Sequence, residues 1–172
     1  DAAATQNAVN YYVVATVWDG ITSNNSNEAS VFMHGNTVYE YMYDDGVKEA
    51  EFAHTGLIAN KFTPNYHSVQ QRVKITTVKF YIAQKTASNM ILKIWQANGA
   101  NNTPDTELYS QTITPAMLNV GWNYIIIPEA NQPQLTSGDF YVGFQESAGS
   151  SKIGVDNNNT GRSYKKTGTT DW

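Results

Sequence analysis

One short segment gathers the densest group of acidic side chains in the chain. Asp44 and Asp45 precede Gly46, and Glu49 and Glu51 follow within five residues. Calcium binds through carboxylate and carbonyl oxygens, which an acidic loop of this kind can supply. We therefore take Asp44, Asp45 and Glu49 as candidate calcium ligands. The alternative is a plain turn, in which an aspartate accepts hydrogen bonds from backbone amides and Gly46 takes a positive φ.

Three aromatic side chains are predicted to face away from the main core, namely Tyr81, Trp95 and Tyr141. Flat rings on a sheet face can stack on the apolar face of a sugar, while polar neighbours bind its hydroxyl groups. Lys79 and Lys93 lie two positions before Tyr81 and Trp95, and therefore on the same faces. Together these five residues predict a glycan-binding surface. The alternative is that another element, such as the N-terminal segment, covers the rings.

The sequence holds no recognisable catalytic pair. Its histidines, His34, His54 and His67, lie in different segments, and none has a neighbour at the spacing of a metal ligand. Nucleophile elbows, zinc-protease motifs and phosphate-binding glycine loops are also absent from the sequence. We therefore expect a protein that is not an enzyme.

The composition limits the cellular locations and the classes of partner that we expect for this protein. Only 15% of the residues are charged, the net charge is -4, and cysteine is absent. Scattered basic residues offer no stripe for a phosphate backbone, so we expect no nucleic acid partner. No run approaches the roughly 20 apolar residues of a membrane-spanning helix. Polarity comes mainly from uncharged residues, which favours a secreted or cell-surface location.

The chain is predicted to be all-β, because β-rich runs recur between turn-forming clusters and no helical periodicity is sustained. Many short strands imply two antiparallel sheets packed as a jelly-roll-like β-sandwich. One helical turn is expected at residues 115–118. The predicted strands cover residues 9–18, 28–34, 37–43, 58–63, 73–83, 89–97, 107–113, 122–128, 139–146, 151–155 and 161–166.

Alternation sorts the two faces of the central strands. Residues 90–95 and 78–82 place their even-numbered apolar side chains inward, and residues 140–144 do the same. Val73 and Ile75 are out of phase with Val78, which predicts a bulge near Thr76 and Thr77. The segment 122–127 is apolar on both faces, so we expect both of its sides to be covered.

Residues 11–33 resemble the last two strands of a fibronectin type III domain. The first strand carries the letters YYVVATV, a DG turn follows, and the second strand begins with SNEASV. The resemblance implies a partial domain at residues 1–35, whose earlier strands are missing. Two strands alone are marginal in water, so this terminal hairpin has to pack elsewhere. Either it covers or extends the main sandwich, or it pairs with a neighbouring molecule.

From about residue 38 onward the sequence resembles a β-sandwich module that recurs in large secreted bacterial proteins. The motifs are YDDG at residues 43–46, ANKFTP at 59–64, VKFYI at 78–82, PDTEL at 104–108 and GDFYVGF at 138–144. This resemblance implies a module at residues 36–172 that stops before the last strand of its family, with neighbouring domains of the same polypeptide as partners.

These features together predict a non-catalytic accessory module that binds a glycan or a surface protein. Two alternatives stay open. One is a structural spacer beside an extracellular protease or glycoside hydrolase, and the other is a filament subunit that donates a strand.

Overall fold

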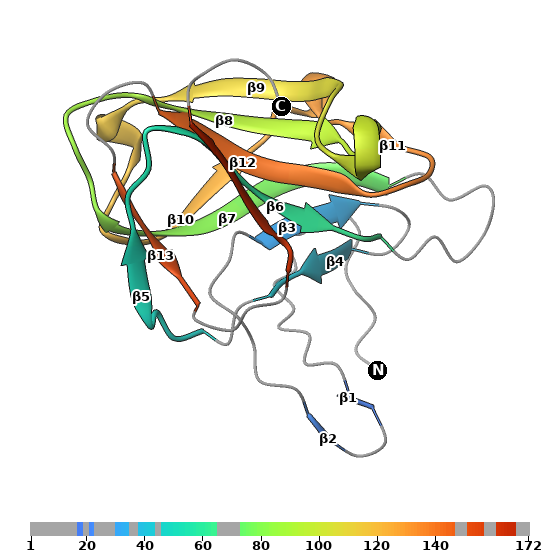
Figure 1. Cartoon of the computed structure of the whole chain (residues 1–172), viewed down its shortest axis with the longest axis horizontal. Helices are drawn as coiled ribbons and strands as arrows, with labels where there is room; N and C mark the ends of the chain where they lie inside the picture. The colour runs from blue at the N-terminus through green and yellow to red at the C-terminus, as the bar shows by residue number, and fades with distance from the viewer. Residues whose placement is uncertain are drawn as a thin grey trace.

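The computed structural model describes residues 17–18, 21–22, 30–34, 38–43, 46–64, 73–146, 151–156 and 161–167. Most of these residues form a β-sandwich of two antiparallel sheets (Figure 1). The prediction of an all-β sandwich is confirmed, whereas the jelly-roll and fibronectin details stay predictions. One sheet has five strands, in the order β14 (Ser163–Thr167), β6 (Gly56–Phe62), β12 (Phe140–Glu146), β8 (Met90–Gln96) and β9 (Glu107–Ile113).

The second sheet has seven strands arranged around the long strand β7 (Val73–Gln84). Its main path runs β4 (Val38–Tyr41), β3 (Ser30–His34), β7, β13 (Lys152–Val155) and β5 (Ala50–Phe52). Two further strands, β10 (Gly121–Ile126) and β11 (Gln134–Leu135), also pair with β7. Strand β7 therefore organises this layer.

Three short 3-10 helices lie in the connections that the structure describes. They are η1 (Ala100–Asn102), η2 (Pro115–Met117) and η3 (Glu129–Asn131). The helical turn predicted at residues 115–118 is thus confirmed by η2. No described helix is long and apolar enough to cross a membrane.

The main core lies between the two sheets, and the predicted alternation is confirmed there. The inward side chains of β7, β8 and β12 are almost fully buried, as is Phe62 of β6. Burial of this much apolar surface supplies the main free energy of folding. The largest members that are less than 2% exposed are Phe62, Phe80, Phe140, Ile75, Ile82, Met90, Leu92 and Ile94.

The predicted bulge in β7 is also confirmed. Phe32 of β3 pairs with Thr77, whereas the next residue, Met33, pairs with Ile75. Thr76 is therefore an extra residue in β7, and it shifts the alternation so that Ile75 and Val78 both point into the core.

Strand β3 pairs with β7 on one side and with β4 on the other. This pairing supports the hypothesis, for residues 30–34, that the terminal hairpin extends the main sandwich. Residues 28–29 and most of the predicted strand at 9–18 lie outside the described residues. Within the parts of the first 35 residues that are described, β1 (Val17–Trp18) pairs with β2 (Ile21–Thr22) in a sheet of their own. The domain boundary at residue 35 stays a prediction.

One prediction about β10 is wrong. Both sides of this strand were expected to be covered, yet only Asn123 and Ile125 are buried, whereas Tyr124 is 47% and Ile126 69% exposed. The reason is the position of β10 in the sandwich. One of its faces packs on the core, and no described element covers the other.

Candidate functional site

The structure divides the five predicted glycan-binding residues between the two outer faces of the sandwich. Tyr81 and Lys79 belong to β7 of the seven-stranded sheet. Trp95 and Lys93 belong to β8, and Tyr141 to β12, both in the five-stranded sheet. The expectation of one cluster made by all three rings is therefore wrong, because alternation fixes the side of each strand but not which sheet the strand joins.

On the five-stranded sheet the two rings face away from the main core, as predicted, but they are not exposed. Trp95 and Tyr141 are each 1% exposed and form a second apolar cluster with Leu57 and Ala59 of β6. Tyr164 of β14 packs edge-on against Tyr141 at a centroid distance of 5.1 Å. The prediction that these rings are available for stacking is therefore wrong.

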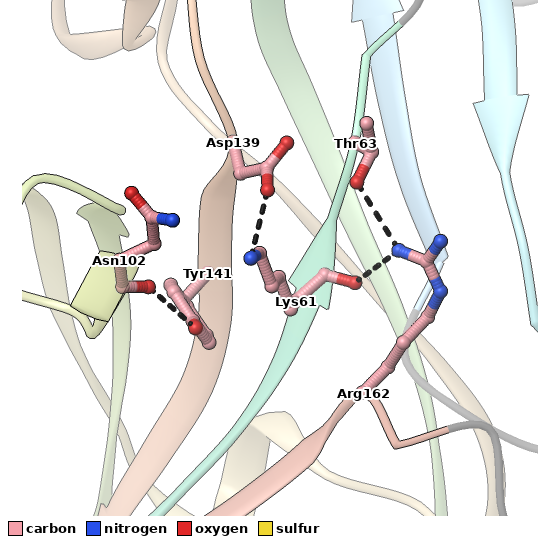
Figure 2. Close-up of polar contacts among 6 residues, drawn as sticks. All are labelled: Lys61, Thr63, Asn102, Asp139, Tyr141 and Arg162. Atoms are coloured by element: carbon pink, nitrogen blue, oxygen red, sulfur yellow. Dashed lines mark hydrogen bonds and ion pairs between the residues drawn. The ribbon is translucent and has the colours of Figure 1, made fainter.

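Polar contacts tie the same face together, as Figure 2 shows. The Tyr141 hydroxyl donates a hydrogen bond of 2.8 Å to the carbonyl oxygen of Asn102, and burial raises the pKa of Tyr141 above its ordinary value. Lys61 Nζ lies 2.8 Å from Asp139 Oδ2, while Arg162 Nη1 lies 3.5 Å from the carbonyl oxygen of Lys61. These contacts hold β6, β12 and the start of β14 in place, which is a structural role.

Lys93 has a similar role. Its Nζ lies 2.8 Å from Glu107 Oε2 on β9 and 5.9 Å from the centroid of the Trp95 ring, and its side chain is 13% exposed. The ammonium group is thus occupied by neighbours of its own sheet.

The outer face of β7 and β10 is different, because aromatic rings remain accessible there. Trp122 pairs with Tyr81 across the two strands, and Tyr124 pairs with Lys79. The rings of Tyr81 and Trp122 meet at 90° with centroids 5.5 Å apart. Lys79 Nζ lies 4.6 Å from the Trp122 centroid and 5.8 Å from that of Tyr124. We call Lys79, Tyr81, Trp122 and Tyr124 the β7–β10 face.

Opposite charges are matched on this sheet. Lys79 Nζ lies 3.4 Å from Oε1 of Glu40, a residue of β4 whose side chain is 4% exposed. Farther along β7, Lys74 Nζ lies 3.8 Å from Glu129 Oε1. Both cations therefore have a carboxylate partner, and the face offers aromatic surface without an uncompensated lysine.

The sequence reasoning found Lys79 and Tyr81 but missed Trp122 and Tyr124. A signal was present, since Trp122, Tyr124 and Ile126 stand at alternate positions. The other side of the same strand also carries apolar residues. For this reason the alternation was interpreted as a strand that is buried on both faces.

Comparison of the chain with protein-family models, curated proteins and solved structures found no match. The assignment of the site therefore depends on the geometry of this chain alone.

The calcium site remains a prediction. Asp44 and Asp45 lie outside the described residues, and Glu49 is exposed. Nearby Glu51 binds Lys48 at 3.0 Å and Lys152 at 3.3 Å, and these lysines lower the pKa of its carboxyl group. Among the residues that are described, no three metal-binding side chains gather in one place.

A buried carboxyl group lies away from both faces, at the end of β12. Glu146 Oε1 accepts a hydrogen bond of 3.0 Å from the backbone amide of Ser151, while Oε2 is buried without a partner among the described residues. Burial raises the pKa of Glu146, and the hydrogen bond from the Ser151 backbone amide opposes this effect only in part. The folded protein therefore binds the proton of the Glu146 carboxyl group more tightly than the unfolded chain does. As the pH rises from the unfolded-state pKa through the raised pKa of the folded state, ionisation of Glu146 lowers the stability of the fold.

We expect Glu146→Gln to stabilise the protein at pH 7 by roughly 1 kcal/mol, the scale of one buried polar group. At pH 4 the carboxyl group of the native protein is mostly protonated, so the difference between the two proteins should shrink. Urea unfolding of both at pH 4 and pH 7 measures this. An equal difference at both pH values would contradict the account of Glu146.

Proposed function

We propose that the chain is a non-catalytic accessory module of a secreted or cell-surface bacterial protein, and that it binds a neutral glycan through the β7–β10 face. The observation that carries the proposal is Tyr124, which is 47% exposed and lies beside Trp122 on one sheet face. The low charged share of the sequence and its resemblance to modules of large secreted bacterial proteins support the setting.

The chemistry follows from the arrangement of the rings. An exposed tyrosine ring offers its flat side to the C–H groups of a sugar, and the phenol oxygen can bind a hydroxyl group. Lys79 interacts with the rings of Tyr124 and Trp122 and so restricts how they turn. Because Lys79 is already paired with Glu40, the face has little attraction for a sulfated or carboxylated sugar.

The test is an array of neutral and acidic oligosaccharides, followed by calorimetry on the glycans that bind. We expect neutral glycans to bind, and Tyr124→Ala and Trp122→Ala each to weaken binding at least about tenfold, equivalent to about 1.4 kcal/mol. Met117→Ala is the matched control, since Met117 is a 44% exposed apolar residue of η2. The control should bind like the native protein.

Two results would contradict the proposal. One is an array on which no glycan binds. The other is binding that survives both aromatic substitutions, which would move the site elsewhere on the molecule.

A second candidate function, a structural spacer, is favoured by a separate observation. Trp95 and Tyr141 are buried in a second apolar cluster, so much of the aromatic content serves the stability of the sandwich. If the chain is a spacer of this kind, we expect that no glycan on the array binds and that the fold is stable.

A further inference from the structure

A pocket is lined by residues of both sheets. Two of the strands that line it, β5 and β13, lie side by side in Figure 1. Its walls come from β5 and β13 of the seven-stranded sheet and from β6, β12 and β14 of the five-stranded sheet. The volume is about 330 Å³. Binding sites for small molecules span about 300–1,000 Å³, so this pocket is large enough for a small ligand.

The walls of the pocket are mainly apolar. Phe52 and Ile153 face it from one sheet, and Ile58 and Phe144 face it from the other. Ile58 and Ile153 also pack against the main core. The pocket therefore continues the apolar layer between the sheets, and an apolar ligand group would complete that layer.

A cation belongs to the same pocket. Lys165 of β14 is exposed, is among the lining residues, and has its Nζ 5.8 Å from the centroid of the Phe52 ring. Within the described part of the chain Lys165 makes no ion pair with a carboxylate, unlike Lys79 and Lys93. Asp156 also lines the pocket, but no ion pair joins it to Lys165 among the described residues. The ammonium group of Lys165 can therefore meet an anionic group of a ligand.

We propose that this inter-sheet pocket binds a small amphipathic carboxylate, with its hydrocarbon part between the sheets and its carboxylate on Lys165. The apolar walls account for the hydrocarbon part, and the lysine accounts for the carboxylate. This site is separate from the β7–β10 face and does not depend on glycan binding.

The test compares octanoate with octanol, which has the same chain length without the charge, by calorimetry on the full chain. We expect octanoate to bind more tightly than octanol. Lys165→Ala should weaken octanoate at least about threefold and leave octanol unchanged, because only the ion pair is lost. Lys166→Ala is the matched control, since the neighbouring side chain of a strand points to the other face.

Val155→Phe fills the pocket from β13 and should abolish binding of both molecules. Backbone amide shifts of the native protein give a second measurement that needs no variant. We expect the shifts induced by octanoate to centre on residues 58–60 and 153–155. Absence of octanoate binding, equal affinity for octanol and octanoate, or shifts that lie elsewhere would overturn the proposal.

Discussion

Replacing Trp95 with alanine is expected to lower the free energy of unfolding by about 3–5 kcal/mol, as removal of a buried tryptophan does in other cores. The ring is 1% exposed and packs with Leu57, Ala59 and Tyr141 in the second apolar cluster. Native proteins are stable by only about 5–15 kcal/mol, so this loss would remove a large share of the free energy of unfolding. Urea unfolding followed by far-UV circular dichroism measures the loss.

Trp122→Ala is the matched control, because the same residue type is half-buried on the opposite outer face. We expect a loss of only about 1–2 kcal/mol there, from the contacts of the indole with Tyr81 and Lys79. Equal losses at the two tryptophans would mean that the five-stranded sheet does not bury Trp95, and its ring would again be a candidate for ligand binding.

Gly143→Ala is expected to cost about 3 kcal/mol or more, the upper end of what an overpacked core loses. Gly143 pairs with Ala59 between the central strands β12 and β6. A methyl group at this position would overlap the carbonyl oxygen of Ile58 and lie 2.7 Å from the Cα and Cβ atoms of Ala59. Because these neighbours include backbone, the two strands would have to separate. Thermal and urea unfolding of the variant measure the loss.

Gly138→Ala separates a steric effect from a conformational one. Gly138 has a φ of 78°, but a methyl group there would meet nothing within 4 Å. Its substitution should therefore cost only about 1–2 kcal/mol, the penalty for a left-handed backbone with a side chain. A smaller loss of stability for Gly143→Ala than for Gly138→Ala would contradict the close approach of β6 and β12 at Gly143.

The inner faces of the long strands were predictable, because alternation over seven or more residues defines a buried side. The bulge at Thr76 was predictable for the same reason, as a break in that alternation. Strands β2, β5 and β11 were missed. They have two or three residues each, which is too short for a period to be recognised.

The environment of the outer faces was not predictable. Trp95 and Trp122 both face away from the main core, yet one is buried and the other remains partly accessible. The difference depends on strands that are distant in the sequence, since β6 and β12 supply the other buried members of the cluster that contains Trp95. Local sequence indicates on which side of a strand a ring lies, whereas the tertiary fold decides what covers it.

The distinction between the two faces is the basis of the functional proposal. On the five-stranded sheet, aromatic residues and ion pairs contact one another and stabilise the layer. On the β7–β10 face, the rings of Trp122 and Tyr124 lie beside a lysine that is paired with Glu40, and Tyr124 is 47% exposed. An accessory module of the proposed kind needs only one such surface.

The most direct test of this account is a titration of the isotope-labelled protein with the neutral oligosaccharide that binds best on the array, followed through backbone amide shifts. We predict that the largest shifts fall on residues 77–82 and 121–126, the paired segments of β7 and β10. Shifts confined to β8 and β12, or to the pocket lined by β5, β13 and β14, would contradict a glycan site on the β7–β10 face.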